Sequence, residues 1–215
     1  MESLFEKERL ELRSNCKDLA GLAFNNDQIS YLPAPVRRYF KVVLKDSYPY
    51  IGSLHIKHDG QYKTGITKEW TNIEGEHYSV ADPPGFLWRG KTALLTVKDS
   101  YISGRGQTTV YLLNILKAIY RTGAASDEEG LTRWLGASVF FPTNLLPSSR
   151  LRWSPIDNGS AKLNCIYEGK EISFTVRFNS SGEIDRMETH LIMEKEEVKP
   201  WTCRFCTYKE VNGIR

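Results

Sequence analysis

Two cysteines near the end of the chain have the spacing of a redox or zinc motif. Cys203 and Cys206 are separated by Arg and Phe. Such a pair supports redox or zinc chemistry only when both sulfurs lie on one side of a turn or helix start. The flanking Trp201 and Tyr208 indicate a strand, on which residues three apart point to opposite faces. The sequence holds no second CxxC pair, so we predict no metal site and no cofactor.

Other short motifs also lack the pattern that known chemistry needs. The histidines are His55, His58, His77 and His190, and their spacing does not suggest a set of metal ligands. Gly104 and Gly106 could begin a phosphate loop, but Thr109 stands where the third glycine of that fingerprint belongs. We expect these glycines at a strand end or bulge instead. There is no Gly-x-Ser-x-Gly nucleophile motif.

One carboxylate, one phenol and one guanidinium group could together form a catalytic site. Asp99 and Tyr101 lie in one segment, and Arg133 lies in a later one. In this alternative the chain is an enzyme of unknown reaction. Asp99 and Tyr101 would serve as acid/base groups, and Arg133 would stabilise an anion.

Aromatic side chains are the most informative feature of the composition. The chain has 5 Trp, 11 Tyr and 9 Phe, enough for a large core or an aromatic-lined cavity. Those on separate elements at positions that can point inward are Trp70, Trp88, Tyr101, Trp134 and Trp153. Trp and Tyr often line semi-apolar pockets because they join an apolar body to a polar group. With Arg133, which could meet an anionic head group, they form the predicted ligand-binding set. Plain core packing is the competing interpretation.

Helical patterns occur at the start and in the middle of the chain. An apolar stripe predicts a helix over residues 2–24, and Pro35 favours a short helix through Val36–Phe40. The stretch from Thr109 to Arg121 is apolar nearly all round, which indicates a buried helix. A capping box from Ser126 to Glu129 is expected to open a second central helix that Pro142 closes.

Alternation with a period of two predicts strands elsewhere. Before the central helices they fall at residues 55–58, 62–70, 77–80, 86–92, 94–97 and 101–103, with a hairpin turn at Asp59-Gly60. After them they fall at residues 151–154, 161–167, 172–178, 184–193 and 201–208. About ten strands around a helical pair predict an α+β fold. We expect one curved antiparallel sheet, a half-open barrel wrapped around the central helical pair, because the short connections exclude a parallel α/β fold. Residues 1–30 would form an N-terminal helical extension, and residues 31–215 a single β-rich domain.

Several of these motifs resemble an uncharacterised bacterial and archaeal family, known only as a domain of unknown function. The matching stretches are Leu32-Pro-Ala-Pro-Val-Arg-Arg-Tyr39, Pro84-Gly-Phe-Leu-Trp88, Asp99-Ser-Tyr-Ile-Ser-Gly-Arg-Gly106, Arg133-Trp-Leu135 and Phe141-Pro-Thr143. The resemblance implies no reaction, substrate or cofactor. The family pattern has Glu where this chain has Ala137, which counts against the catalytic alternative. The inferred architecture is similar to that of bacterial lipoprotein carriers, a half-open barrel that holds acyl chains, but function does not follow from fold.

Charge and hydropathy exclude some classes of function. The net charge is +3, and no long basic run occurs, so we expect no nucleic-acid partner. No stretch reaches the roughly 20 apolar residues of a membrane span. The N-terminus lacks the apolar core of a signal peptide, which favours a cytoplasmic location with reduced thiols.

The leading functional hypothesis is therefore a non-enzymatic domain. It would bind an apolar or amphipathic small ligand, such as a lipid, in the hollow of its curved sheet. The rivals are the enzyme described above and a scaffold or oligomerisation module that works through the N-terminal helix.

Overall fold

The computed structural model describes residues 2–63, 69–192 and 198–215. The helices are α1 (Glu2–Ser14), η1 (Asn26–Ile29), α2 (Ala34–Val43), α3 (Ala124–Ala137), η2 (Ser138–Phe140) and η3 (Pro142–Leu145). The first sheet holds β1 (Ser53–Tyr62), β2 (Thr71–Val80), β3 (Gly85–Lys91), β4 (Leu95–Ile102), β5 (Arg105–Leu112) and β6 (Leu116–Arg121). The second holds β7 (Leu151–Pro155), β8 (Ser160–Tyr167), β9 (Lys170–Phe178), β10 (Ile184–Ile192) and β11 (Val198–Arg204).

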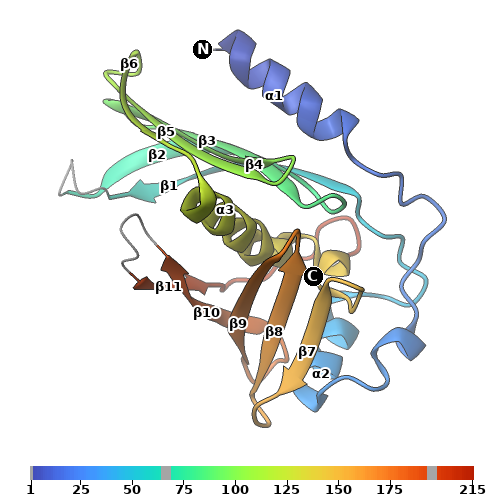
Figure 1. The fold of residues 1–215 in the computed structure, drawn as a ribbon. Helices are drawn as coiled ribbons and strands as arrows, with labels where there is room; N and C mark the ends of the chain where they lie inside the picture. Colours follow the sequence, from blue (N-terminus) through green and yellow to red (C-terminus); the bar gives the residue numbers. More distant parts are fainter. Residues whose placement is uncertain (1, 64–68, 193–197) are drawn as a thin grey trace. The chain divides into compact units, whose positions relative to one another are not determined.

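The chain divides into two compact units (Figure 1). Unit 1 consists of Met1–Lys17 and Gly52–Trp134, and unit 2 of Asp18–Ile51 and Leu135–Arg215. Both sheets are antiparallel meanders, so the predicted α+β class is confirmed. The expected single sheet of ten strands is wrong, because the strands of the described residues pair only within their own half of the chain, as six and five.

In unit 1, the register of the six-stranded sheet places one residue of each strand in a row across it. The members of this row, from β1 to β6, are Ile56, His77, Trp88, Asp99, Thr108 and Arg121. Residues paired directly across antiparallel strands share a face of the sheet. α1 and α3 lie on opposite faces of this sheet (Figure 1). We call these the α1 face and the α3 face.

On the α1 face, the N-terminal helix is held by apolar and ionic contacts. Phe5 and Leu12 of α1 form a buried cluster with Val80 and Leu87 of the sheet. Nearby, Lys98 Nζ donates to Glu8 Oε1 over 2.6 Å. The helix therefore packs on its own sheet, and it is shorter than predicted because it ends at Ser14.

On the α3 face, glycines allow the helix to lie close to the sheet. A Cβ at Gly106 would collide with the Ser126 backbone, and a Cβ at Gly130 would meet the Tyr101 ring at 2.7 Å. The Gly106 N–H also donates to Asp127 Oδ1 over 2.7 Å. Ser126 lies inside α3 here, so the predicted capping box is wrong.

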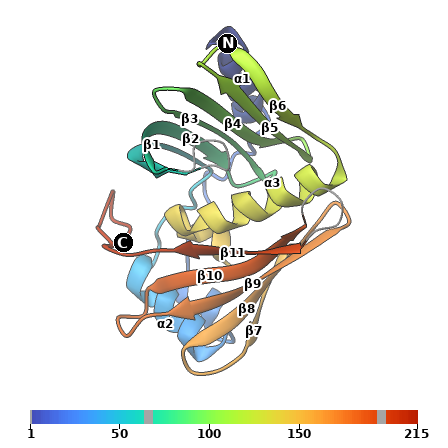
Figure 2. The same ribbon diagram turned by 90° about the vertical axis from the view of Figure 1, so that its left-hand side faces the viewer.

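Unit 2 is built around its own five-stranded sheet, with α2 packed against β8 (Figure 2). The predicted helix after Pro35 is confirmed, and its Val36 and Phe40 are buried. Trp153 on β7 is buried as well, and its Nε1 donates to the Leu145 carbonyl over 2.9 Å. All five strands predicted for this half of the chain are present, with shifted ends.

The predicted buried helix from Thr109 to Arg121 is wrong. The segment forms the second half of β5, a turn at Leu113–Asn114, and β6. Leu116, expected in the core, is 57% exposed. A segment that is apolar at nearly every position is compatible with a buried helix and with a hairpin. Here β5 pairs with β4, and the segment forms the hairpin. Only α3 remains of the expected helical pair.

The predicted turn at Asp59-Gly60 is also wrong. Both residues lie within β1, and Gly60 pairs with Ile73. Ile66, expected on the following strand, lies outside the described residues. Among the helices of the described part of the chain, none is long and apolar enough to cross a membrane.

Candidate functional site

The structure brings part of the predicted ligand-binding set together in unit 1. Trp88, Tyr101 and Arg133 lie on the α3 face or on α3 itself. Trp134 is buried, and its Nε1 donates to the Val80 carbonyl over 2.8 Å, so it serves the core of this unit. Trp70 lies just before β2 and is 63% exposed. Trp153 belongs to unit 2.

Two flat rings lie on the α3 face above glycines. The His58 imidazole occupies the place where Gly75 would carry a Cβ, and the Trp88 indole does the same at Gly90, each within 2.5 Å of that position. Trp88 Nε1 donates to His58 Nε2 over 2.8 Å, and the rings lie 8° from parallel. Tyr62 lies against Trp88, at 6.4 Å between ring centroids. His58, Trp88 and Tyr62 are partly exposed and form what we call the aromatic plate.

An ion cluster lies beside the plate, where α3 meets the sheet. Arg133 Nη2 donates to Glu129 Oε1 over 2.6 Å, and Arg133 Nη1 lies 3.7 Å from Asp99 Oδ2. Arg121 Nη1 completes the cluster at 3.4 Å from Glu129 Oε2. Burial disfavours the charged guanidinium of Arg133, but Asp99 and Glu129 outweigh that effect and raise its pKa. Two cations and two anions make the cluster neutral.

Asp99 has an unused hydrogen-bond acceptor in this cluster. The residue is 8% exposed, and its Oδ1 is buried without accepting a hydrogen bond from any described residue. A buried carboxylate oxygen without a donor is costly and rare in proteins. Burial raises the pKa of Tyr62, with a further upward contribution from Asp99 that Arg133 and Arg121 oppose. The phenol, the carboxylate and the two guanidinium groups therefore share one electrostatic environment.

His77 is a partly exposed residue of the same face with one buried nitrogen. It lies in register beside Trp88, stacks on Phe86 at 5.5 Å, and leaves Nε2 buried without a partner among the described residues. Burial lowers the pKa of His77 to about 4, with a smaller contribution from His58. The imidazole is therefore neutral at pH 7.

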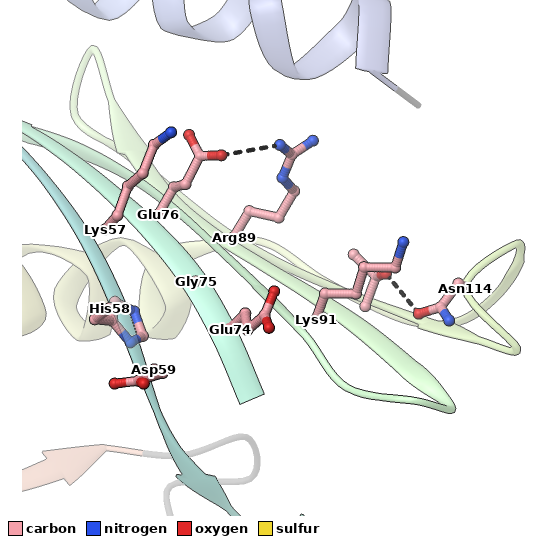
Figure 3. A pocket seen from close by; sticks show the side chains of 10 residues that line it. Lys57, His58, Asp59, Glu74, Gly75, Glu76, Arg89, Lys91 and Asn114 are labelled. Atoms are coloured by element: carbon pink, nitrogen blue, oxygen red, sulfur yellow. Dashed lines mark hydrogen bonds and ion pairs between the residues drawn. The ribbon is translucent and has the colours of Figure 1, made fainter. Parts of the chain in front are cut away.

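A hollow of about 920 Å³ lies on the α1 face. Figure 3 shows Lys57, Glu76 and Arg89 on one side of the strands and His58 on the other. The Arg89 guanidinium lies 3.5 Å from the Glu76 carboxylate. The charged residues of the lining are Lys57, Asp59, Glu74, Glu76, Arg89 and Lys91. Acids and bases are mixed in this lining, so the hollow is unlike the apolar one expected from the sequence.

Sequence reasoning missed several residues of the site. The sequence pattern predicts Glu129 in a helix cap, and it predicts no binding role for His58, Tyr62 or Arg121. Only the register of β1, β2 and β3 brings His58 and Tyr62 to Trp88. The paired glycines Gly75 and Gly90 within strands were the available signal, because a strand glycine often marks a close approach.

The described residues contain no set of side chains suited to bind a metal ion. Nowhere in them do three or more His, Cys, Asp or Glu residues form a group that could hold an ion. Cys203 lies on β11, and Cys206 lies beyond the end of that strand. The Sγ of Cys203 lies 3.4 Å from the position of a Cβ at Gly136, so it packs against the end of α3.

Comparison with known protein families identifies the family of this chain. It belongs to a family of unknown function, DUF6544, whose model matches residues 22–215. This confirms the resemblance noted from the sequence motifs. A comparison with the curated proteins finds no match.

Proposed function

We propose that the chain binds a small amphipathic molecule on the α3 face of its six-stranded sheet. The ligand would place a flat or extended apolar part on the aromatic plate and a polar head at Asp99. The observation that carries this proposal is the buried Oδ1 of Asp99, which has no donor among the described residues and lies in register beside Trp88. A ligand head that donates a hydrogen bond would satisfy this oxygen.

The charges of the cluster favour a donor head group over an anion. Arg133 already faces Asp99 and Glu129, so an anionic head would meet two carboxylates as well as the guanidinium. A hydroxyl or ammonium group would instead meet the free lone pairs of Asp99. This proposal replaces the anionic head group expected from Arg133 alone.

Apolar side chains continue from the plate along the same face. Leu95, Val97 and Val110 form a buried cluster against which Tyr62 and Trp88 pack. Contact with these side chains would favour an apolar ligand body by about 25 cal/mol for each Å² removed from water. A ligand that reached this cluster would have to displace Tyr62, which is partly exposed.

The test is a binding titration with single-chain amphiphiles that differ only in the head group. An alkyl alcohol, an alkyl ammonium and an alkyl sulfate would be followed by tryptophan emission and by calorimetry. We expect saturable binding of the first two, at least about tenfold weaker binding to Asp99→Asn, and unchanged binding to Asp59→Asn on the α1 face. Preference for the sulfate, or equal binding to both variants, would refute the proposal.

Asp99 also supports a second candidate function, the catalytic one. A buried carboxylate with a free oxygen next to a phenol and a guanidinium can act as a general base. In that case Asp99→Asn would retain ligand affinity and lose turnover of the bound molecule. Mass spectrometry of an amphiphile incubated with each protein separates the two functions, because a binder returns the amphiphile unchanged.

The scaffold alternative has less support. It requires that the apolar stripe of the N-terminal helix lack a partner within its own chain. Phe5 and Leu12 of that stripe are buried on the sheet of unit 1.

A further inference from the structure

The β5–β6 hairpin ends in an exposed apolar tip. Leu113 and Ile115 are 55% and 71% exposed, and Leu116 follows them on β6. Leu94, in the turn between β3 and β4, is exposed beside them. We call these four residues the tip patch. Asn114 joins the two turns, because its Nδ2 donates to the Ala93 carbonyl over 3.2 Å.

The backbone of the tip makes leucine an unfavourable choice for the fold. Leu113 and Asn114 both have positive φ, at 53° and 62°, in the turn closed by Ile115 N–H donating to the Leu112 carbonyl. The left-handed region favours Gly and Asn, and a leucine there costs about 1 kcal/mol. Two other hairpins of this chain place a polar residue and a glycine in such turns, at Ser103–Gly104 and Glu168–Gly169. The conformation of the turn therefore does not explain why a leucine stands at the tip.

Exposed side chains surround β6 on both sides. Leu116 and Ile119 share a face with Val110, whereas Lys117 and Tyr120 lie on the other face. All four are exposed. A rigid protein partner would cover one face of such a hairpin, but a fluid apolar phase can surround every side of an inserted tip.

The charge around the tip complements an anionic surface. The two turns of the tip, residues 92–95 and 113–115, contain no acidic residue, while Lys91 ends β3 and Lys117 follows Leu116 on β6. The Lys117 Nζ lies 3.7 Å from the centre of the Tyr120 ring. Tyrosine and lysine are the residues that favour the headgroup region of a bilayer.

We propose that the tip patch docks the protein on the surface of an anionic lipid bilayer. Leu113, Ile115 and Leu116 would enter the acyl boundary, with Leu94 beside them. Lys117 and Tyr120 would remain at the level of the headgroups. The inference is independent of the proposed ligand site, because no residue of the tip patch belongs to the aromatic plate or the ion cluster.

The experiment is co-sedimentation of the full chain with vesicles of phosphatidylglycerol and phosphatidylcholine in equal amounts, and with vesicles of phosphatidylcholine alone. We expect binding to the mixed vesicles that weakens with added salt and with Lys117→Glu. Leu113→Ser combined with Leu116→Ser should lower the partition coefficient at least about tenfold. The matched control is Ile156→Ser combined with Ile166→Ser, which removes two exposed apolar side chains of unit 2 and should leave binding unchanged.

A second measurement keeps the proposal testable if binding is weak. Leu113→Trp should show a blue shift of its emission on the mixed vesicles, and quenchers placed in the acyl chains should reduce that emission. Absence of vesicle binding by the wild-type chain, or equal binding by the tip and control variants, would overturn the proposal. So would a concentration-dependent dimer, measured by sedimentation velocity, that the tip variant abolishes without any loss of vesicle binding, because a second copy would then cover the tip.

Discussion

The indole of Trp88 donates a hydrogen bond from Nε1 to Nε2 of His58 over 2.8 Å, with the two rings nearly parallel. This bond requires His58 to carry its proton on Nδ1 when neutral. It also holds the indole flat above Gly90 and the imidazole flat above Gly75. The surface available to a ligand therefore consists of the faces of these rings. The rings can lie flat because Gly75 and Gly90 have no side chains.

A methyl group at position 90 should disturb this plate. In Gly90→Ala the new Cβ would lie 2.5 Å from atoms of Trp88 and Ile73, so at least one side chain must move. We expect a loss of about 1 to 3 kcal/mol in the free energy of unfolding and a red shift of tryptophan emission. Gly60→Ala is the control, because its Cβ would meet nothing within 4 Å. Equal urea denaturation curves for the two variants would contradict the placement of Trp88.

The ion cluster predicts a non-additive effect. Arg133→Met leaves the buried carboxylate of Asp99 without its countercharge and should cost about 2 to 3 kcal/mol of stability. Adding Asp99→Asn removes the charge that was left unpaired, so the double variant should be more stable than Arg133→Met alone. A double-mutant cycle in urea measures this coupling, and strict additivity would show that the two side chains do not interact.

His77 predicts a dependence of stability on pH between about 6.5 and 4. Its pKa is about 4 in the folded chain and near 6.5 when unfolded. Within this window the unfolded state binds a proton that the folded state does not, so stability falls as the pH is lowered. The fall should be about 2 kcal/mol once the partial exposure of the ring is allowed for. His77→Phe should lose this component. Urea titrations of both proteins at pH 7 and pH 5 test it, and parallel losses would exclude His77 as the cause.

Opposite outcomes are expected for an aspartate at two apolar positions of the first sheet. Leu116→Asp lies on an exposed edge strand and should change stability by less than about 1 kcal/mol. Val97→Asp places an unpaired carboxylate in the buried cluster of β4 and should cost several kcal/mol or prevent folding. Melting temperatures of the two variants decide the matter. A severe effect of Leu116→Asp would show that residues 109–121 are buried after all.

Local patterns in the sequence are enough to predict much of the secondary structure and the family. Regular alternation between turns with glycine predicted the strands of unit 2, since each strand has one buried face. Pro35 marked the start of α2, because its fixed φ suits a first helical turn. The motifs from Leu32 to Thr143 indicated membership of the family that the chain belongs to. The proposed division into a helical extension of residues 1–30 and one β-rich domain stays a prediction.

The conformation of residues 109–121 and the composition of the site depend on tertiary contacts. The apolar run has no single period, so the choice between helix and hairpin depends on pairing with β4, which the sequence does not encode locally. Asp99 is a candidate on sequence grounds, but Arg133, which also binds Glu129, reaches it only because α3 crosses the sheet at that point. His58 and Trp88 are 30 residues apart and meet through the register of three strands. Contacts of this kind depend on strand register and helix placement, which are properties of the whole fold and not of any short segment.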